Sequence, residues 1–341
     1  MIARSPALPL SLAAVLGEIE RRLESGDEFG CELDRALQLL ATLPPDQIAR
    51  ADWAIAAAAG LYHRQPPPAL RRLLPGHPND KKRLLKTPGL EFLFLFHRDG
   101  RLREAALLKI TEGLTSPFLF AAILWRLNDW AAPVRRAAIR CATRSFPLTR
   151  PEVVAEAAIK LLGRQLSWGR WNEERDLLDN VLARNDVADH LAQLIMRGAT
   201  GPLASVLGYA LRTPALDAHL HQIAMQAVQP SVRAVALDAL INGKAKWLSG
   251  FAWQWIDKSH GMRRRVPVFA HRTLSVSFSK IELIARGVRD RSAVVRRTAL
   301  TGVICYLPTT EEGQNYAAML LEDRSPSVRE RAEFILRSGT G

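Results

Sequence analysis

The chain repeats one short phrase close to its end. Residues 290–300 read DRSAVVRRTAL, and residues 323–333 read DRSPSVRERAE. Residues 129–138 carry a similar phrase, DWAAPVRRAA, and two stretches, 229–240 and 99–107, carry partial copies. A phrase that recurs at a fixed distance indicates a chain built from similar structural units, because every unit then repeats the same local packing.

The arginines of these phrases give the period. They are Arg103, Arg135, Arg233, Arg296 and Arg329, and they are separated by 32, 98, 63 and 33 residues. These separations are one, three, two and one multiples of about 32 residues. A single period therefore spans residues 100–330, and it predicts degenerate units centred near residues 168, 200 and 264.

Each unit is predicted to be a pair of helices. Apolar residues follow the Val-Arg pair at helical spacing, as in Val295, Ala299 and Val303. Helical stretches also precede the phrase, at 281–288 and 316–321. Asp, Ser and Pro in the linkers suit a turn and the start of the next helix. One such pair cannot bury its apolar face alone, whereas stacked pairs can.

The phrase Asp-x-Ser-x-x-Val-Arg-x-x-Ala, in helix pairs of about 32 residues, resembles the HEAT-repeat family in its short bacterial form. Asp290–Ala299 and Asp323–Ala332 carry the resemblance best, and Asp129–Ala138 carries it in part. The resemblance implies an all-α fold, an α-solenoid (superhelix) of about seven or eight HEAT-like helix pairs. It also implies that the Asp and Arg of the phrase bond across neighbouring units and are structural: Asp129, Arg135, Asp290, Arg296, Asp323 and Arg329.

Residues 1–95 lack the phrase. They contain helical stretches at 32–43 and 51–62, followed by a segment rich in Pro and Gly. We expect 1–95 to form a divergent N-terminal helical cap with an irregular Pro-rich loop at 64–88, and 96–341 to form the repeat solenoid. A small separate helical domain is the alternative for the first 95 residues.

The positive charge is concentrated in one segment. The whole chain has a formal net charge of +13, and residues 241–300 contain 13 Lys or Arg and three Asp or Glu. Cations interleaved with aromatic residues suit a phosphate backbone with accessible bases, and they also suit an acidic protein surface. The predicted partner-binding residues are Lys244, Lys246, Trp253, Lys258, Arg263, Arg264, Arg265, Arg272 and Lys280.

The aromatic residues of this segment have a simpler interpretation as well. Trp247, Phe251 and Trp255 are spaced by four, which places them on one face of a helix and predicts that they belong to the core. Trp253 lies off that face and is expected to be exposed. The arginine run 263–265 follows Gly261, and we expect it between helices or at the start of one.

Catalytic motifs are absent from the sequence, which contains no HExxH, P-loop, GxSxG or GxGxxG. An enzymatic alternative comes from a weaker resemblance to alkylpurine DNA glycosylases built from HEAT-like repeats. In that family a concave basic face holds Trp and Asp near the lesion. Trp125 and Asp129, with Arg164 in the next unit, resemble that arrangement, and so do Trp253 and Asp257. The catalytic candidates are therefore Asp129, Trp125 and Asp257.

The sequence thus predicts a non-enzymatic binding or scaffold protein whose basic segment, 241–300, engages an acidic protein partner or nucleic acid. The choice between these partners stays open, with a slight preference for protein. A HEAT-like DNA-binding protein or an alkylpurine DNA glycosylase is the alternative. We expect no cofactor, no metal, no membrane and no small-molecule substrate. Three scattered cysteines, and no apolar run of about 18 residues, favour a cytoplasmic location.

Overall fold

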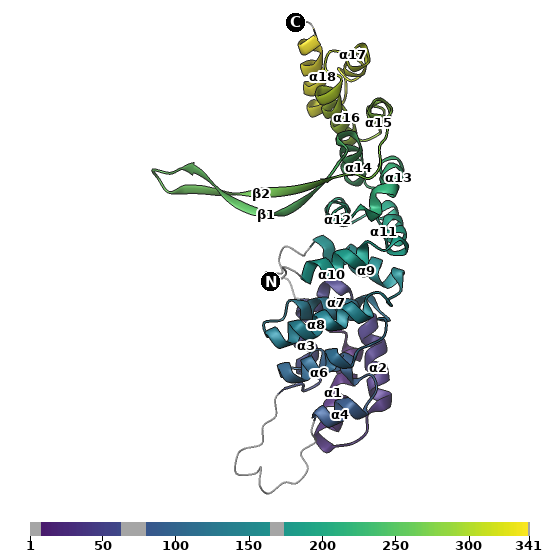
Figure 1. The fold of residues 1–341 in the computed structure, drawn as a ribbon, viewed down its shortest axis with the longest axis vertical. Helices are drawn as coiled ribbons and strands as arrows, with labels where there is room; N and C mark the ends of the chain where they lie inside the picture. Colours follow the sequence, from purple (N-terminus) through teal and green to yellow (C-terminus); the bar gives the residue numbers. More distant parts are fainter. Residues whose placement is uncertain (1–7, 63–79, 164–173, 340–341) are drawn as a thin grey trace. The chain divides into compact units, whose positions relative to one another are not determined.

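The computed structural model describes residues 8–62, 80–163 and 174–339. Within these ranges the chain is mostly helical, with eighteen α-helices, two short 3-10 helices and one sheet of two strands (Figure 1). The helical character agrees with the expected class, and the sheet is a feature that the sequence analysis missed. The chain divides into two compact units, Met1–Val181 and Leu182–Gly341.

The first unit is helical throughout its described residues. Its elements, with α10 at its end, are α1 (Leu10–Ser25), α2 (Gly30–Ala41), η1 (Pro45–Gln47), α3 (Ile48–Ala58), α4 (Asp80–Lys86), α5 (Leu90–Phe94), α6 (Gly100–Lys109), α7 (Pro117–Leu127), α8 (Ala132–Ser145), α9 (Pro151–Leu161) and α10 (Glu174–Leu182). Helix α8 packs against α6 and α7, and α7 also packs against α2 and α3. The boundary suggested near residue 95 therefore lies within this unit.

The second unit contains the sheet. Its elements are α11 (Asn185–Arg197), α12 (Leu203–Ala210), η3 (Pro214–His219), α13 (Leu220–Gln226), α14 (Pro230–Asn242), β1 (Lys244–Asp257), β2 (Met262–Thr273), α15 (Lys280–Gly287), α16 (Ala293–Tyr306), α17 (Glu311–Ala318) and α18 (Pro326–Gly339). Helix α16 packs against α14, α15 and α18.

The apolar stripes that follow the Val-Arg pairs form the core between these helices. Val295, Ala299 and Val303 of α16 are buried. Val134 and Ala138 occupy the equivalent positions of α8 and are buried as well. The sequence spacing therefore identified which face of these helices contacts its neighbours.

The arginine of each phrase makes the same local hydrogen bond. Its Nη1 donates to the carbonyl oxygen six residues earlier, in the turn before its own helix. The guanidinium therefore donates to a carbonyl oxygen of the turn, which accepts no hydrogen bond from within the helix. The bonds are Arg103 to His97 (2.8 Å), Arg135 to Asp129 (2.8 Å), Arg233 to Ala227 (2.8 Å), Arg296 to Asp290 (2.8 Å) and Arg329 to Asp323 (2.6 Å).

Three of these arginines also hold the aspartate of the following phrase through Nε and Nη2. Each of these carboxylates in addition accepts the backbone N–H two residues after it. Two parallel bonds between a guanidinium and a carboxylate belong to the strong class of hydrogen bonds. We call these pairs the Arg–Asp clamps: Arg103–Asp129 (2.9 and 2.9 Å), Arg233–Asp290 (2.9 and 2.8 Å) and Arg296–Asp323 (2.6 and 2.9 Å).

The clamps show where the sheet interrupts the pattern. Arg103 and Arg296 lie 26 and 27 residues before their aspartates, whereas Arg233 lies 57 residues before Asp290. The additional residues form strands β1 and β2, between α14 and α15. The degenerate helical unit expected near residue 264 is therefore wrong, because that position lies in β2. The inserted hairpin is nearly as long as one period. The spacing of the phrase arginines therefore counted it as one more helical unit.

The remaining expectations about organisation are met in part. Residue 200 lies in the connection between α11 and α12. The degenerate unit near residue 168 falls outside the described residues. Of the irregular loop expected over 64–88, most also lies outside them, and the expectation is wrong for residues 80–86, which form helix α4.

Candidate functional site

The basic segment forms a long antiparallel β-hairpin that extends away from the helices of its unit (Figure 1). Strand β1 pairs with β2 from Lys244 opposite Thr273 to Asp257 opposite Met262. The hairpin begins at Gly243, whose φ of 64° ends α14 in the left-handed region that favours glycine. We call residues 244–273 the hairpin.

The root of the hairpin is fixed to the helices by Arg272. Its guanidinium donates two hydrogen bonds to Asp217, at 2.6 and 2.9 Å, and others to the carbonyl oxygens of Leu211 and Thr213. Burial raises the pKa of Asp217, but the bonds from Arg272 and Ser275 outweigh it, and the net pKa is lowered. Arg272 was predicted to bind a partner, whereas its charge is used within the chain to anchor β2.

One face of the hairpin carries three aromatic rings, two of which lie against arginine guanidinium groups. Trp253 lies opposite Arg265, and Trp255 lies opposite Arg263, so these side chains share a face. Phe251 belongs to the same face, because alternate residues of a strand point the same way. The Arg263 guanidinium lies 4.4 Å from the Trp253 ring centroid, and that of Arg265 lies 4.2 Å from the Phe251 centroid.

These rings are open to solvent. Phe251, Trp253 and Trp255 are 46%, 59% and 51% exposed. Trp247, Phe251 and Trp255 were expected to lie on one helical face in the core. That expectation is wrong, because all three lie on a strand. Exposed aromatic residues gathered on a ribbon of two strands are typical of an interaction surface.

The opposite face of the hairpin carries the third arginine of the run, Arg264. Arg264 donates two hydrogen bonds, at 3.0 and 2.9 Å, to Oε1 of Gln254 across the strands. The arginine run was expected between helices or at the start of one, and this expectation is wrong because it lies within β2. Since side chains alternate along a strand, the three arginines present charge on both faces of the ribbon.

The tip of the hairpin is closed by a small polar network around Asp257. Its carboxylate accepts hydrogen bonds from the Ser259 hydroxyl at 2.5 Å and from the backbone N–H groups of Ser259 and His260. His260 Nδ1 lies 2.8 Å from the other carboxylate oxygen. The bonds from Ser259 and then His260 lower the pKa of Asp257 to about 2. Asp257 therefore helps to form the turn.

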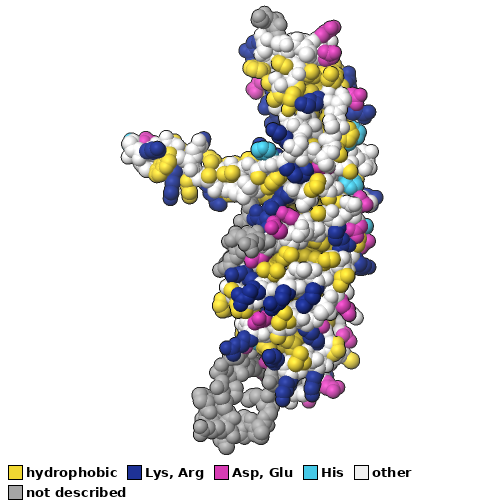
Figure 2. All heavy atoms as spheres, viewed as in Figure 1, with side chains coloured by type: hydrophobic (Ala, Val, Ile, Leu, Met, Phe, Trp, Pro, Cys, Tyr) yellow, Lys and Arg dark blue, Asp and Glu magenta, His cyan; other side chains and the backbone are white. Residues whose placement is uncertain are grey.

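Charge on the hairpin is strongly asymmetric. It contains seven Lys or Arg residues, and Asp257 is its one acidic residue. Figure 2 shows Lys and Arg side chains next to hydrophobic ones along its length. Lys258 is exposed at the turn, and Lys246 lies 4.4 Å from the Phe269 ring centroid. Lys280, which was grouped with these residues, lies in α15 over the ring of Tyr306.

The structure does not bring the first set of glycosylase-like residues into an open site. Asp129 is 5% exposed, and its carboxylate accepts from Arg103, Arg126 and the Ala131 N–H. Trp125 is half-buried one turn before it, and Arg164 lies outside the described residues. The carboxylate of Asp129 is thus already surrounded by donors from its own unit.

The second set rests on a helical spacing that does not exist. Trp253 and Asp257 lie on strand β1, and Asp257 belongs to the network at the tip.

Within the described ranges, no group of three or more His, Cys, Asp or Glu side chains has the arrangement of a metal site. No helix among the described residues has both the length and the apolar character needed to cross a membrane.

A comparison with models of known protein families finds no match for this chain, and a comparison with curated proteins finds none either.

Proposed function

We propose that the chain is a nucleic-acid-binding protein whose hairpin enters the major groove of a duplex. The observation that carries the proposal is the projecting two-stranded ribbon with arginines on both faces. A major groove is about 12 Å wide and admits a two-stranded β-ribbon. The phosphates that line the groove on both sides would then meet cations on both faces of the ribbon.

The arginine side chains of the hairpin are arranged to contact phosphate groups. Arg263 and Arg265 lie against Trp253 and Phe251, which orients their planar guanidinium groups before any partner arrives. An oriented guanidinium suits bidentate contact with a phosphate group, and less conformational entropy is lost on binding. The exposed aromatic rings beside them offer apolar contact to base edges in the groove, such as the methyl group of thymine.

We also propose that the helices form a HEAT-like solenoid that holds the hairpin. The recurring hydrogen bond from each phrase arginine, and the three Arg–Asp clamps, support this part of the proposal. Helix pairs held in register would give the hairpin a rigid base. The Arg272–Asp217 ion pair would connect strand β2 to that base. The proposed activity is binding, with no bond cleavage, and the cytoplasmic location remains a prediction.

Fluorescence anisotropy with a labelled DNA or RNA duplex tests the proposal. The triple variant Arg263→Ala/Arg264→Ala/Arg265→Ala is expected to bind about 10- to 100-fold more weakly than the unmodified chain at low salt, because it loses three phosphate contacts. The control Lys81→Ala/Lys82→Ala/Lys86→Ala removes the same charge from α4 and should bind almost normally. Equal losses in both variants would contradict the proposal. No binding of either duplex at low salt would also overturn it and would favour an acidic protein partner.

A further inference from the structure

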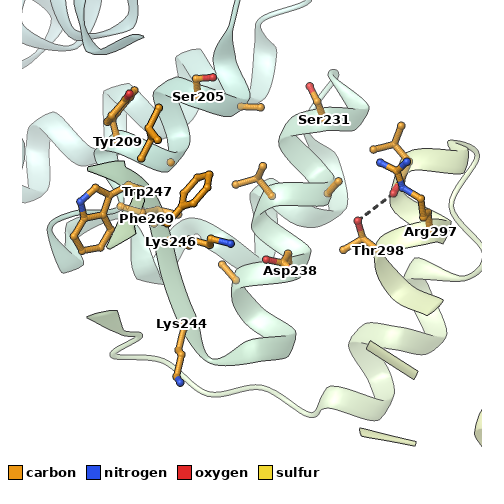
Figure 3. Close-up of a pocket in the computed structure, with 18 residues that line it drawn as sticks. Ser205, Tyr209, Ser231, Asp238, Lys244, Lys246, Trp247, Phe269, Arg297 and Thr298 are labelled. Atoms are coloured by element: carbon orange, nitrogen blue, oxygen red, sulfur yellow. Dashed lines mark hydrogen bonds between the residues drawn. The ribbon is translucent and has the colours of Figure 1, made fainter. Parts of the chain in front are cut away.

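A cavity of about 570 Å³ lies within the second unit where the root of the hairpin meets α12, α14 and α16 (Figure 3). This volume is within the usual range for small-molecule sites. Its aromatic side chains are Tyr209, Trp247 and Phe269, and small residues such as Gly208 and Ala234 line the rest. Two of the three aromatic residues, Trp247 and Phe269, come from the hairpin itself.

The cavity also holds charged groups of both signs. Asp238 of α14 is half-buried, and burial raises its pKa, although Lys246 acts in the opposite direction. Figure 3 shows the Lys246 ammonium directed toward Asp238, with the ring of Phe269 next to it. Asn242 donates to one Asp238 oxygen at 3.0 Å, and a carboxylate has about four acceptor positions, so it retains capacity for a ligand. Lys244 and Arg297 also line the cavity.

These groups match the parts of one nucleotide. A planar base needs an aromatic neighbour, which Phe269 provides. The exocyclic amine or ring N–H of a base needs an acceptor, which Asp238 provides. The phosphate attached to that base needs a cation, and Arg297 lies in the same lining.

We propose that this cavity receives a single unpaired nucleotide of the nucleic acid that the hairpin binds. The inference rests on the proposed function and adds a preference to it. The hairpin would supply general affinity for the duplex, and the cavity at its root would select a strand with a base available outside the stack. A base that is already unpaired avoids the cost of unstacking, which favours such a strand.

The test compares a duplex that carries a single-nucleotide bulge of 2-aminopurine with the same duplex without the bulge. We expect about tenfold tighter binding of the bulged duplex, because stacking one base on aromatic side chains is worth about that much. The fluorescence of 2-aminopurine should change on binding as the base packs against Phe269. Asp238→Asn should bring the two affinities close to each other and leave binding of the plain duplex unchanged.

Phe269→Ala provides a second variant, and Phe278→Ala is its matched control, since Phe278 is 38% exposed and stacks on His221 outside the cavity. The preference should fall in Phe269→Ala and persist in Phe278→Ala. Equal affinity for both duplexes in the unmodified chain, or a preference that both cavity variants retain, would overturn this inference and leave the proposed function intact. Failure to bind either duplex would overturn both.

Discussion

Replacing Arg233 with methionine should destabilise the second unit more than replacing any equivalent arginine that lacks a carboxylate partner. Arg233 is 2% exposed, and it donates two hydrogen bonds to Asp290 and two to backbone carbonyl oxygens, at 2.8 and 3.2 Å. Methionine preserves most of the side-chain volume but supplies none of these bonds. The variant therefore leaves a part-buried carboxylate without its cation.

The expected magnitude follows from this loss. Removing one partner of a buried ion pair costs about 3–5 kcal/mol of the free energy of unfolding. For a unit of this size each kcal/mol lowers Tm by about 2–4 °C, so a fall of about 6–20 °C is expected. Arg329 is the comparison, because among the described residues its guanidinium donates to the Asp323 carbonyl oxygen and to no carboxylate. Arg329→Met should cost about 0.5–1.5 kcal/mol.

Guanidinium chloride titrations followed by circular dichroism measure both free energies. Asp290→Asn and the double variant complete the comparison, because the pair should show a coupling energy of about 1 kcal/mol or more. The reasoning is refuted if Arg233→Met costs no more than Arg329→Met. It is also refuted if the effects of the two single variants of the Arg233–Asp290 pair simply add.

Further predictions concern acid, the hairpin tip and one glycine. The clamp lowers the folded pKa of its aspartate, so its stabilisation is present above about pH 4 and is lost as the pH falls through the folded pKa; the cost of Arg233→Met should shrink in acid, and an unchanged cost at pH 2 would contradict this. Hydrogen bonds from Ser259 and the following histidine should make Asp257 titrate at about 2 by NMR, and a midpoint near its ordinary value would count against the network. In Gly313→Ala the new Cβ would lie 2.0 Å from the Leu307 carbonyl oxygen; thermal denaturation should show a loss of about 1–3 kcal/mol, and unchanged stability would be inconsistent with this contact.

The sequence predicted the helices well because their apolar spacing is specific to a helix over several turns. Val295, Ala299 and Val303 are separated by four residues, and they lie on the buried face of α16. The same spacing failed for Phe251 and Trp255, which share a face of strand β1. Four is also a multiple of two, so residues spaced by four share a face in a strand as well as in a helix. Spacing alone therefore does not distinguish the two structures over three residues.

Other signals in that segment do favour a hairpin. The residues between 244 and 273 are rich in aromatic and β-branched types, and the five residues from Lys258 to Met262 include Gly261, which adopts a φ of 66°. Pro267 is tolerated in β2 because both strands of a two-stranded sheet are edges. The regular period hid these signals, since the insertion is close to one period in length.

The candidate site was predicted in composition but not in geometry. Charge counting located the basic segment, because formal charge depends only on sequence. It did not separate Arg272, which is held by Asp217 from a distant part of the chain, from Arg263 and Arg265, which lie on aromatic rings. The contact that holds Arg272 joins residues 55 positions apart, and a local pattern contains no information about it.

The salt dependence of duplex binding tests the central claim most directly. Each phosphate contact contributes about −0.9 to the slope of log Kobs against log salt concentration. The triple variant Arg263→Ala/Arg264→Ala/Arg265→Ala should therefore have a slope shallower by about 2 to 3 than the unmodified chain. The α4 control, with Lys81, Lys82 and Lys86 replaced by alanine, should keep the original slope. Identical slopes for the triple variant and the unmodified chain would contradict the claim that the hairpin binds the nucleic-acid backbone.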